Sequence, residues 1–103
     1  MGQRLHVIKK DKYRIIITAF DDPEYEKILK GESKNNYRLT LKEKLSENGL
    51  EGFEADNINN TLGFSLHSKL NFGTYIYVIE KIDGAKKSIE ELAYGFIEVL
   101  PDV

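Results

Sequence analysis

The 103-residue chain contains no cysteine and no tryptophan, and it has only two prolines and one methionine. Without cysteine there is no disulfide, no thiolate zinc site, no iron–sulfur cluster and no cysteine nucleophile. Neither sign of charge dominates, because 15 basic side chains stand against 17 acidic ones and the net charge is only -2. A duplex-DNA-binding domain normally displays a basic face, so this balance argues against nucleic acid as the partner.

The N-terminal region lacks the long apolar run that a signal peptide or a membrane span requires. Charged side chains interrupt its first twenty positions, at Arg4, Lys9, Lys10, Asp11, Lys12 and Arg14. We therefore expect neither a signal peptide nor insertion into a membrane. Domains most often run to ~100–150 residues, and the chain shows no linker, repeat or low-complexity tract. We predict one domain over residues 1–103.

The chain does contain β-forming sequence, and the densest run covers residues 13–20. It is rich in β-branched and aromatic side chains, which favour strands. Alternate residues of a strand share a face, and this predicts one face made of Tyr13, Ile15, Ile17 and Ala19, with Ile16 and Phe20 on the other.

A β-hairpin is predicted over residues 73–100. Its first strand covers residues 74–82, the dipeptide Asp83-Gly84 is typical of a tight turn, and the second strand covers residues 94–100. Weaker strands are predicted over residues 5–8, 37–42 and 61–67. Six or more short strands separated by turn signals indicate a β-sandwich or a small barrel.

Two segments also fit short helices, which would make the fold α+β. Residues 41–49 could form two helical turns that end at Gly49. The run from Ser88 to Glu91 matches a capping box and could open a short helix.

Residues suited to catalysis or metal binding are few. His6 and His67 are the only histidines, and they lack the spacing of a metal site. No serine lies in a Gly-x-Ser-x-Gly elbow, and the glycines do not form a phosphate-binding loop. We expect no catalytic residue, no cofactor, no metal and no small-molecule substrate, so the protein is predicted not to be an enzyme.

The densest acidic cluster is Asp21-Asp22-Pro23-Glu24, directly after the first strong strand. Paired carboxylates can hold Ca²⁺, but Asp-Asp-Pro at the end of a strand is first of all a turn signal. The spacing does not match a calcium loop, and the interpretation as a turn is preferred.

Aromatic side chains make up 11% of the chain and are the remaining clue to function. Tyr75 and Tyr77 share one face of the predicted hairpin. Either this face lies in the core, or it meets a partner, since tyrosine is enriched at interfaces. The candidate partner-contacting residues are these two tyrosines, the two aspartates and a polar loop, that is Tyr75, Tyr77, Asp21, Asp22, Asn57, Asn59 and Asn60.

Several motifs resemble a domain that recurs in phage and prophage tail regions, of the kind found at the start of baseplate upper proteins. The C-terminal half carries the clearest of them, Phe64-Ser-Leu-His-Ser-Lys-Leu-Asn-Phe-Gly-Thr-Tyr-Ile-Tyr77 and Gly95-Phe-Ile-Glu-Val-Leu-Pro-Asp-Val103. Ile8-Lys-Lys-Asp-Lys-Tyr-Arg-Ile and Ile28-Leu-Lys-Gly31 are similar to the opening of that family. Lys10 stands where the family has a glycine, and residues 42–60 have no counterpart.

The resemblance implies an immunoglobulin-like antiparallel β-sandwich of about 6–8 strands, with or without one short helix. It also implies a non-enzymatic virion structural or attachment module of a tail, baseplate or capsid-decoration type. Such a module would dock onto other phage structural proteins and onto copies of itself, in the virion or in the cytoplasm of the infected or lysogenic host. The alternative is a small intracellular inhibitor or immunity protein that binds one host or toxin protein, which the size and mild acidity suit equally well.

Overall fold

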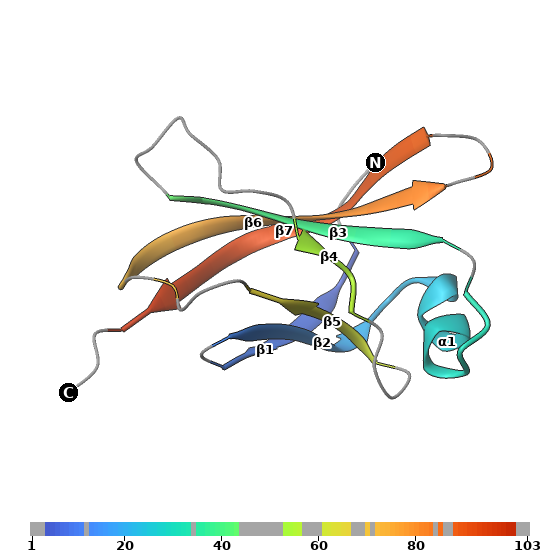
Figure 1. Ribbon diagram of the computed structural model, residues 1–103, viewed down its shortest axis with the longest axis horizontal. Helices are drawn as coiled ribbons and strands as arrows, with labels where there is room; N and C mark the ends of the chain where they lie inside the picture. Colours follow the sequence, from blue (N-terminus) through green and yellow to red (C-terminus); the bar gives the residue numbers. More distant parts are fainter. Residues whose placement is uncertain are drawn as a thin grey trace.

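The protein is a sandwich of two antiparallel sheets, with a single helix among the described residues at one end (Figure 1). The computed structural model describes residues 4–11, 13–33, 35–43, 53–56, 61–66, 70, 72–83, 85 and 88–100. In chain order the elements are β1 His6–Lys10, β2 Arg14–Phe20, α1 Pro23–Leu29, β3 Asn36–Glu43, β4 Phe53–Glu54, β5 Leu62–Ser65, β6 Gly73–Asp83 and β7 Ser88–Val99. The predicted all-β sandwich is confirmed.

The strand order follows the immunoglobulin-like plan. One sheet has the order β1-β2-β5 and the other β4-β3-β6-β7. The first, second and fifth strands therefore form one sheet, while the third, sixth and seventh belong to the other, as in immunoglobulin-like sandwiches. The short β4 pairs with β3 and forms the edge strand of the second sheet.

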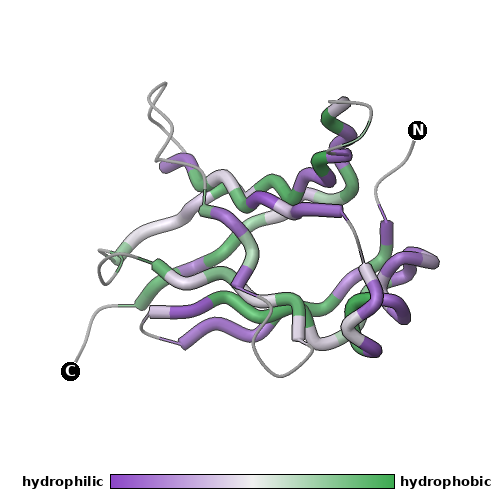
Figure 2. Tube along the Cα trace, turned by 45° about the vertical axis from the view of Figure 1, so that its right-hand side comes forward, coloured by the Kyte–Doolittle hydropathy of each residue, from purple (hydrophilic) through white to green (hydrophobic). Residues whose placement is uncertain are grey.

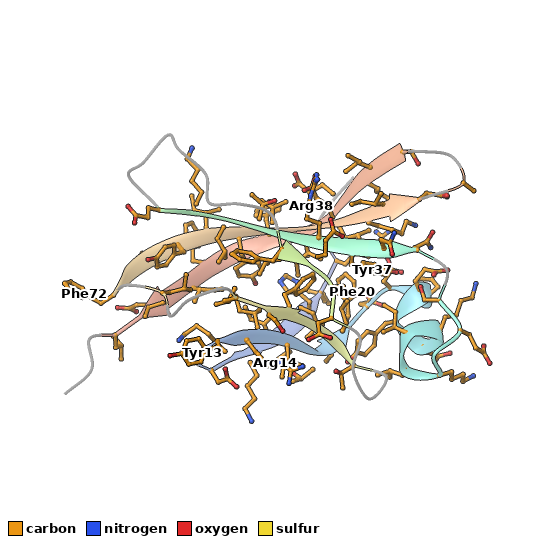
Figure 3. The ribbon with its side chains drawn as sticks, in the orientation of Figure 1. Tyr13, Arg14, Phe20, Tyr37, Arg38 and Phe72 are labelled. Carbon is orange, nitrogen blue, oxygen red and sulfur yellow. The ribbon has the colours of Figure 1, made fainter. Side chains whose placement is uncertain are left out.

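The core lies between the two sheets and is built by alternation along each strand. Hydrophobic and hydrophilic residues alternate along both sheets in Figure 2. In Figure 3, Phe20 and Tyr37 lie between the layers, whereas Arg38 lies on the outer side of the four-stranded sheet. The most deeply buried side chains come from both sheets: Ile15, Ile17, Tyr37, Leu39, Leu41, Leu62, Phe64, Ile79 and Leu92.

A bulge in β2 changes the predicted faces of that strand. Val7 pairs with Ala19 and Ile8 pairs with Ile17, which leaves Thr18 as an extra residue. The extra residue reverses the alternation after Ile17. Ala19, predicted to share the face of Ile17, is exposed, and Phe20, predicted to face the other way, is buried.

A second bulge lies in β7. Ile79 pairs with Ala93 and Glu80 pairs with Glu91, so that Leu92 is the extra residue. Leu92 and Ala93 are both buried although they are consecutive. The residues from Ser88 to Glu91 belong to this strand, and the alternative of a helix there is wrong. Pairing with the far end of β6 supplies their backbone hydrogen bonds.

The predicted hairpin of β6 and β7 is confirmed and is longer than expected. Its last pair is Asp83 with Ser88, so the connection covers residues 84–87 instead of a two-residue turn. Gly84 itself lies outside the described residues. Of the helix predicted over residues 41–49, residues 41–43 belong to β3 and the remainder lies outside the described part.

The segment after β2, predicted from the sequence to be a turn, forms a helix. Asp22 is its N-cap, Pro23 opens its first turn, and Gly31 follows its end with φ of 73°. Glu24 and Glu26 in the first turn suit the positive end of the helix dipole. These are the usual start and stop signals of a helix, and here they flank a helix of only seven residues.

Candidate functional site

Tyr75 and Tyr77 face the core and not a partner. They are only 3% and 6% exposed. The sequence left open whether these tyrosines lie in the core or contact a partner. The structure places both in the core, so their assignment as partner-contacting residues is corrected. The reason is parity: residues 75, 77 and 79 of β6 point toward the opposite sheet.

Tyr77 links the two sheets through His6. The Oη atom of Tyr77 lies 2.6 Å from Nε2 of His6, and Nδ1 of His6 lies 2.8 Å from the carbonyl oxygen of Arg4. The rings of His6 and Tyr77 meet edge to face at 5.6 Å. Gly95 is the partner of Tyr77 in β7, and its missing side chain leaves room for the tyrosine ring. This arrangement is a structural bridge, and burial raises the pKa of Tyr77.

Asp22 is also used within the fold. Its Oδ1 accepts a bond of 2.9 Å from the backbone N–H of Glu24, and its Oδ2 accepts one of 2.9 Å from Nε of Arg4. It is buried, so it is not displayed to a partner. Asp21 is exposed beside it. The remaining candidates Asn57, Asn59 and Asn60, together with His67, lie outside the described residues.

The outer face of the four-stranded sheet carries an apolar patch that the sequence analysis did not single out. Its members are Ile76 and Val78 of β6 with Tyr94 and Phe96 of β7, and we call these four residues the outer patch. Ile76 pairs with Phe96 and Val78 with Tyr94, so the four side chains form two adjacent rows. Tyr94 is 49% exposed and Phe96 is 67% exposed.

At one end of the sheet the outer patch is followed by the polar row of Thr74 and Glu98, and at the other it stops at charges. Phe72 immediately precedes β6 and Leu100 immediately follows β7, and both are exposed. Figure 3 shows Phe72 at this end of the molecule. At the opposite end Arg38 donates to Glu80 across the strands, with Nη2 and Oε1 3.2 Å apart. The patch therefore has a polar border at both ends.

Few charges lie within the rows of the outer patch. Beside it on β3 are Thr40, which pairs with Val78, and Lys42, which pairs with Ile76. Toward the end of the sheet, Thr74 pairs with Glu98. Lys42 and Glu98 thus lie on the two strands that flank β6. Depletion of charge around exposed aromatic residues is typical of the core of a protein interface.

A signal for this face was present in the sequence. Both faces of the predicted hairpin carry apolar side chains, because Ile76 and Val78 alternate with Tyr75 and Tyr77. The tyrosines of β6 drew attention to the inward face, whereas the aromatic residues of β7 at positions 94 and 96 mark the outward one.

No group of three or more histidine, aspartate or glutamate side chains that could hold a metal ion occurs among the described residues. An open depression of about 460 Å³ beside α1 is lined by Phe20, Asp21, Asp22, Pro23, Tyr25, Glu26 and Leu29. The described part of the chain has no helix that is long and apolar enough to cross a membrane.

Comparison of the chain with protein-family models, with curated proteins and with solved structures gave no match. Function is therefore inferred from the surface of the sandwich, where the outer patch is the most distinctive feature.

Proposed function

We propose that this sandwich is a non-catalytic protein-docking module that binds through the outer patch. The observation that carries the proposal is the pair of exposed aromatic residues, Tyr94 and Phe96, packed beside Ile76 and Val78 on one sheet face. Following the resemblance in its sequence, we assign the module to a phage or prophage virion, as a structural or attachment part of a tail, a baseplate or a capsid decoration.

The outer patch exposes a substantial apolar area to water. A fully exposed aromatic side chain presents about 200 Å², so Tyr94 and Phe96 together present about 230 Å², to which the half-buried Ile76 and Val78 add. The largest apolar patch on a typical monomer is ~300–600 Å² and is often functional. Such a surface favours association with another protein.

The outer patch also lies on a rigid support. Its residues belong to β6 and β7, which pair over eleven positions, and β3 pairs with β6 over eight more. The opposite side of the same strands is packed into the core. A preorganised surface loses little conformational entropy on binding, which suits a docking role.

The proposal can be tested by site-specific photo-crosslinking in the cells that naturally produce the protein. A photoreactive phenylalanine analogue is placed at position 96, and in a matched control at Val7, which is 56% exposed on β1 of the other sheet. We expect protein adducts from position 96 and few from position 7, with the adducts present in the particle fraction. Equal labelling at both positions, or none at position 96, would contradict docking through this face.

The same experiment separates the virion assignment from the alternative of an inhibitor. Adducts to one host protein, in cells without particles, would replace the virion assignment by that alternative while leaving the docking face in place.

A further inference from the structure

We propose that the outer patch binds a second copy of this chain, with the two four-stranded sheets packed face to face about a two-fold axis. This inference rests on the proposed docking function and names the partner. It makes the outer patch a self-complementary surface, in which each contact occurs twice.

The surface area that two such faces would bury supports self-pairing. The exposed side chains that border this face add Leu100 to the three aromatic residues already described, and Ile76 and Val78 are half-buried between them. Pairing two such faces would remove on the order of 1,000 Å² from water, which is the lower limit for a specific interface. Two sheets stacked ~10 Å apart exclude water from their inner faces, and this is the geometry of the sandwich itself.

The charged side chains beside the outer patch also support self-pairing. Among the described residues, the rows at Thr74, Ile76 and Val78 contain one cation, Lys42, and one anion, Glu98, on opposite sides of the central strand β6, and the next row holds the Arg38–Glu80 pair and Glu91. In a two-fold pair, Lys42 of one copy can face Glu98 of the other, and the reverse contact follows by symmetry. These three rows are thus neutral and complementary to themselves, whereas an acidic or basic partner would leave Lys42 or Glu98 opposed by its own sign.

Face-to-face packing is favoured over pairing through the edge of β7. β7 is the last strand of its sheet, but the backbone N–H of Arg4 already donates to the carbonyl oxygen of Leu92 at 2.9 Å. The bulge at Leu92 and Ala93 also twists the edge there, and bulges oppose edge-to-edge pairing. Edge pairing would moreover leave both outer patches exposed side by side.

The test is sedimentation velocity of the purified chain from ~1 µM to ~1 mM, a range that covers the weak affinities typical of interfaces at the small end of the size range. We expect a monomer–dimer equilibrium. Phe96→Lys should weaken dimerisation at least 100-fold, and Val7→Lys, on the other sheet, should leave it unchanged.

Charge reversal supplies a second set of variants that does not touch the apolar residues. Lys42→Glu or Glu98→Lys alone should weaken the dimer roughly tenfold, and the double variant should restore it. Circular dichroism and melting temperature show whether each variant is folded. If Phe96→Lys fails to fold, the charge-reversal set decides the question.

A chain that stays monomeric at ~1 mM, or a dimer unaffected by Phe96→Lys and by charge reversal, would overturn self-pairing through this face. If a monomeric chain still forms adducts with another protein from position 96 in cells, self-pairing is wrong and the docking function stands. If a monomeric chain forms no adduct from position 96, self-pairing and the docking function are both wrong.

Discussion

Replacing Gly95 with alanine is expected to destabilise the protein by displacing Tyr77 from its place in the core. A Cβ atom at position 95 would lie 2.5 Å from Oη, 2.7 Å from Cζ and 2.9 Å from Cε1 of that tyrosine. Non-bonded heavy atoms settle at ~3.5–4.0 Å, so the ring has to move by roughly 1 Å. Because Oη lies only 2.6 Å from Nε2 of His6, the movement breaks the bond that joins the two sheets.

Three contributions set the size of the loss. Overpacking a core costs ~1–3 kcal/mol, and losing a buried hydrogen bond costs ~1 kcal/mol. Alanine recovers ~0.5–1 kcal/mol, because glycine has more freedom in the unfolded chain. We expect a net loss of about 2 kcal/mol, or roughly 10–15 °C in melting temperature for a domain of this length.

The assay is urea denaturation followed by circular dichroism, with Gly63→Ala as the matched control. Gly63 is buried in β5, but a Cβ atom there would meet nothing closer than Nη2 of Arg14 at 3.4 Å. The control should stay within ~1 kcal/mol of the wild type. A Gly95→Ala variant as stable as the wild type, or an alanine at position 95 equally destabilising in a Tyr77→Leu background, would show that displacement of Tyr77 is not the cause.

Two further predictions concern the helix cap and the buried tyrosines. Asp22→Ala should lower the free energy of unfolding by about 1 kcal/mol because the helix cap is lost, and further because the contact with Arg4 is lost. Asp22→Asn should keep the cap. Equal urea midpoints for the two variants would argue against the role of Asp22 as the cap. Burial raises the pKa of Tyr37 and of Tyr77, and unfolded tyrosine ionises near pH ~10. Stability should therefore hold below pH ~10 and fall above it, as the unfolded state loses protons first. Tyr37→Phe should reduce this fall, and it should cost little at neutral pH because the buried hydroxyl has no hydrogen-bond partner among the described residues.

The strands were predictable because one physical signal specifies them. Alternation of apolar and polar residues located β3 and β5 to within a residue or two, and the β-branched run located β2. The two bulges were not predictable in the same way. Thr18 and Leu92 look like ordinary strand residues, and their extra position is set by the register of the neighbouring strand.

The helix and the outer patch were missed for different reasons. The cap at Asp22, the proline after it and Gly31 are genuine helix signals, but seven residues are too few for a periodic pattern to form. At the β6–β7 hairpin, apolar side chains on both faces left open which face enters the core. That choice depends on how the two sheets stack, which a single strand does not encode.

The outer patch should be exposed in the free chain and covered when the protein docks. Hydroxyl-radical footprinting of the purified chain tests this expectation directly, with Tyr13, exposed between β1 and β2, as an internal reference. We expect Tyr94 and Phe96 to react in dilute solution about as readily as Tyr13, and to become protected at high concentration while Tyr13 does not. Protection of Phe96 already in dilute solution would contradict the assignment of the exposed face. Unchanged reactivity across the concentration series would contradict its burial against a second copy.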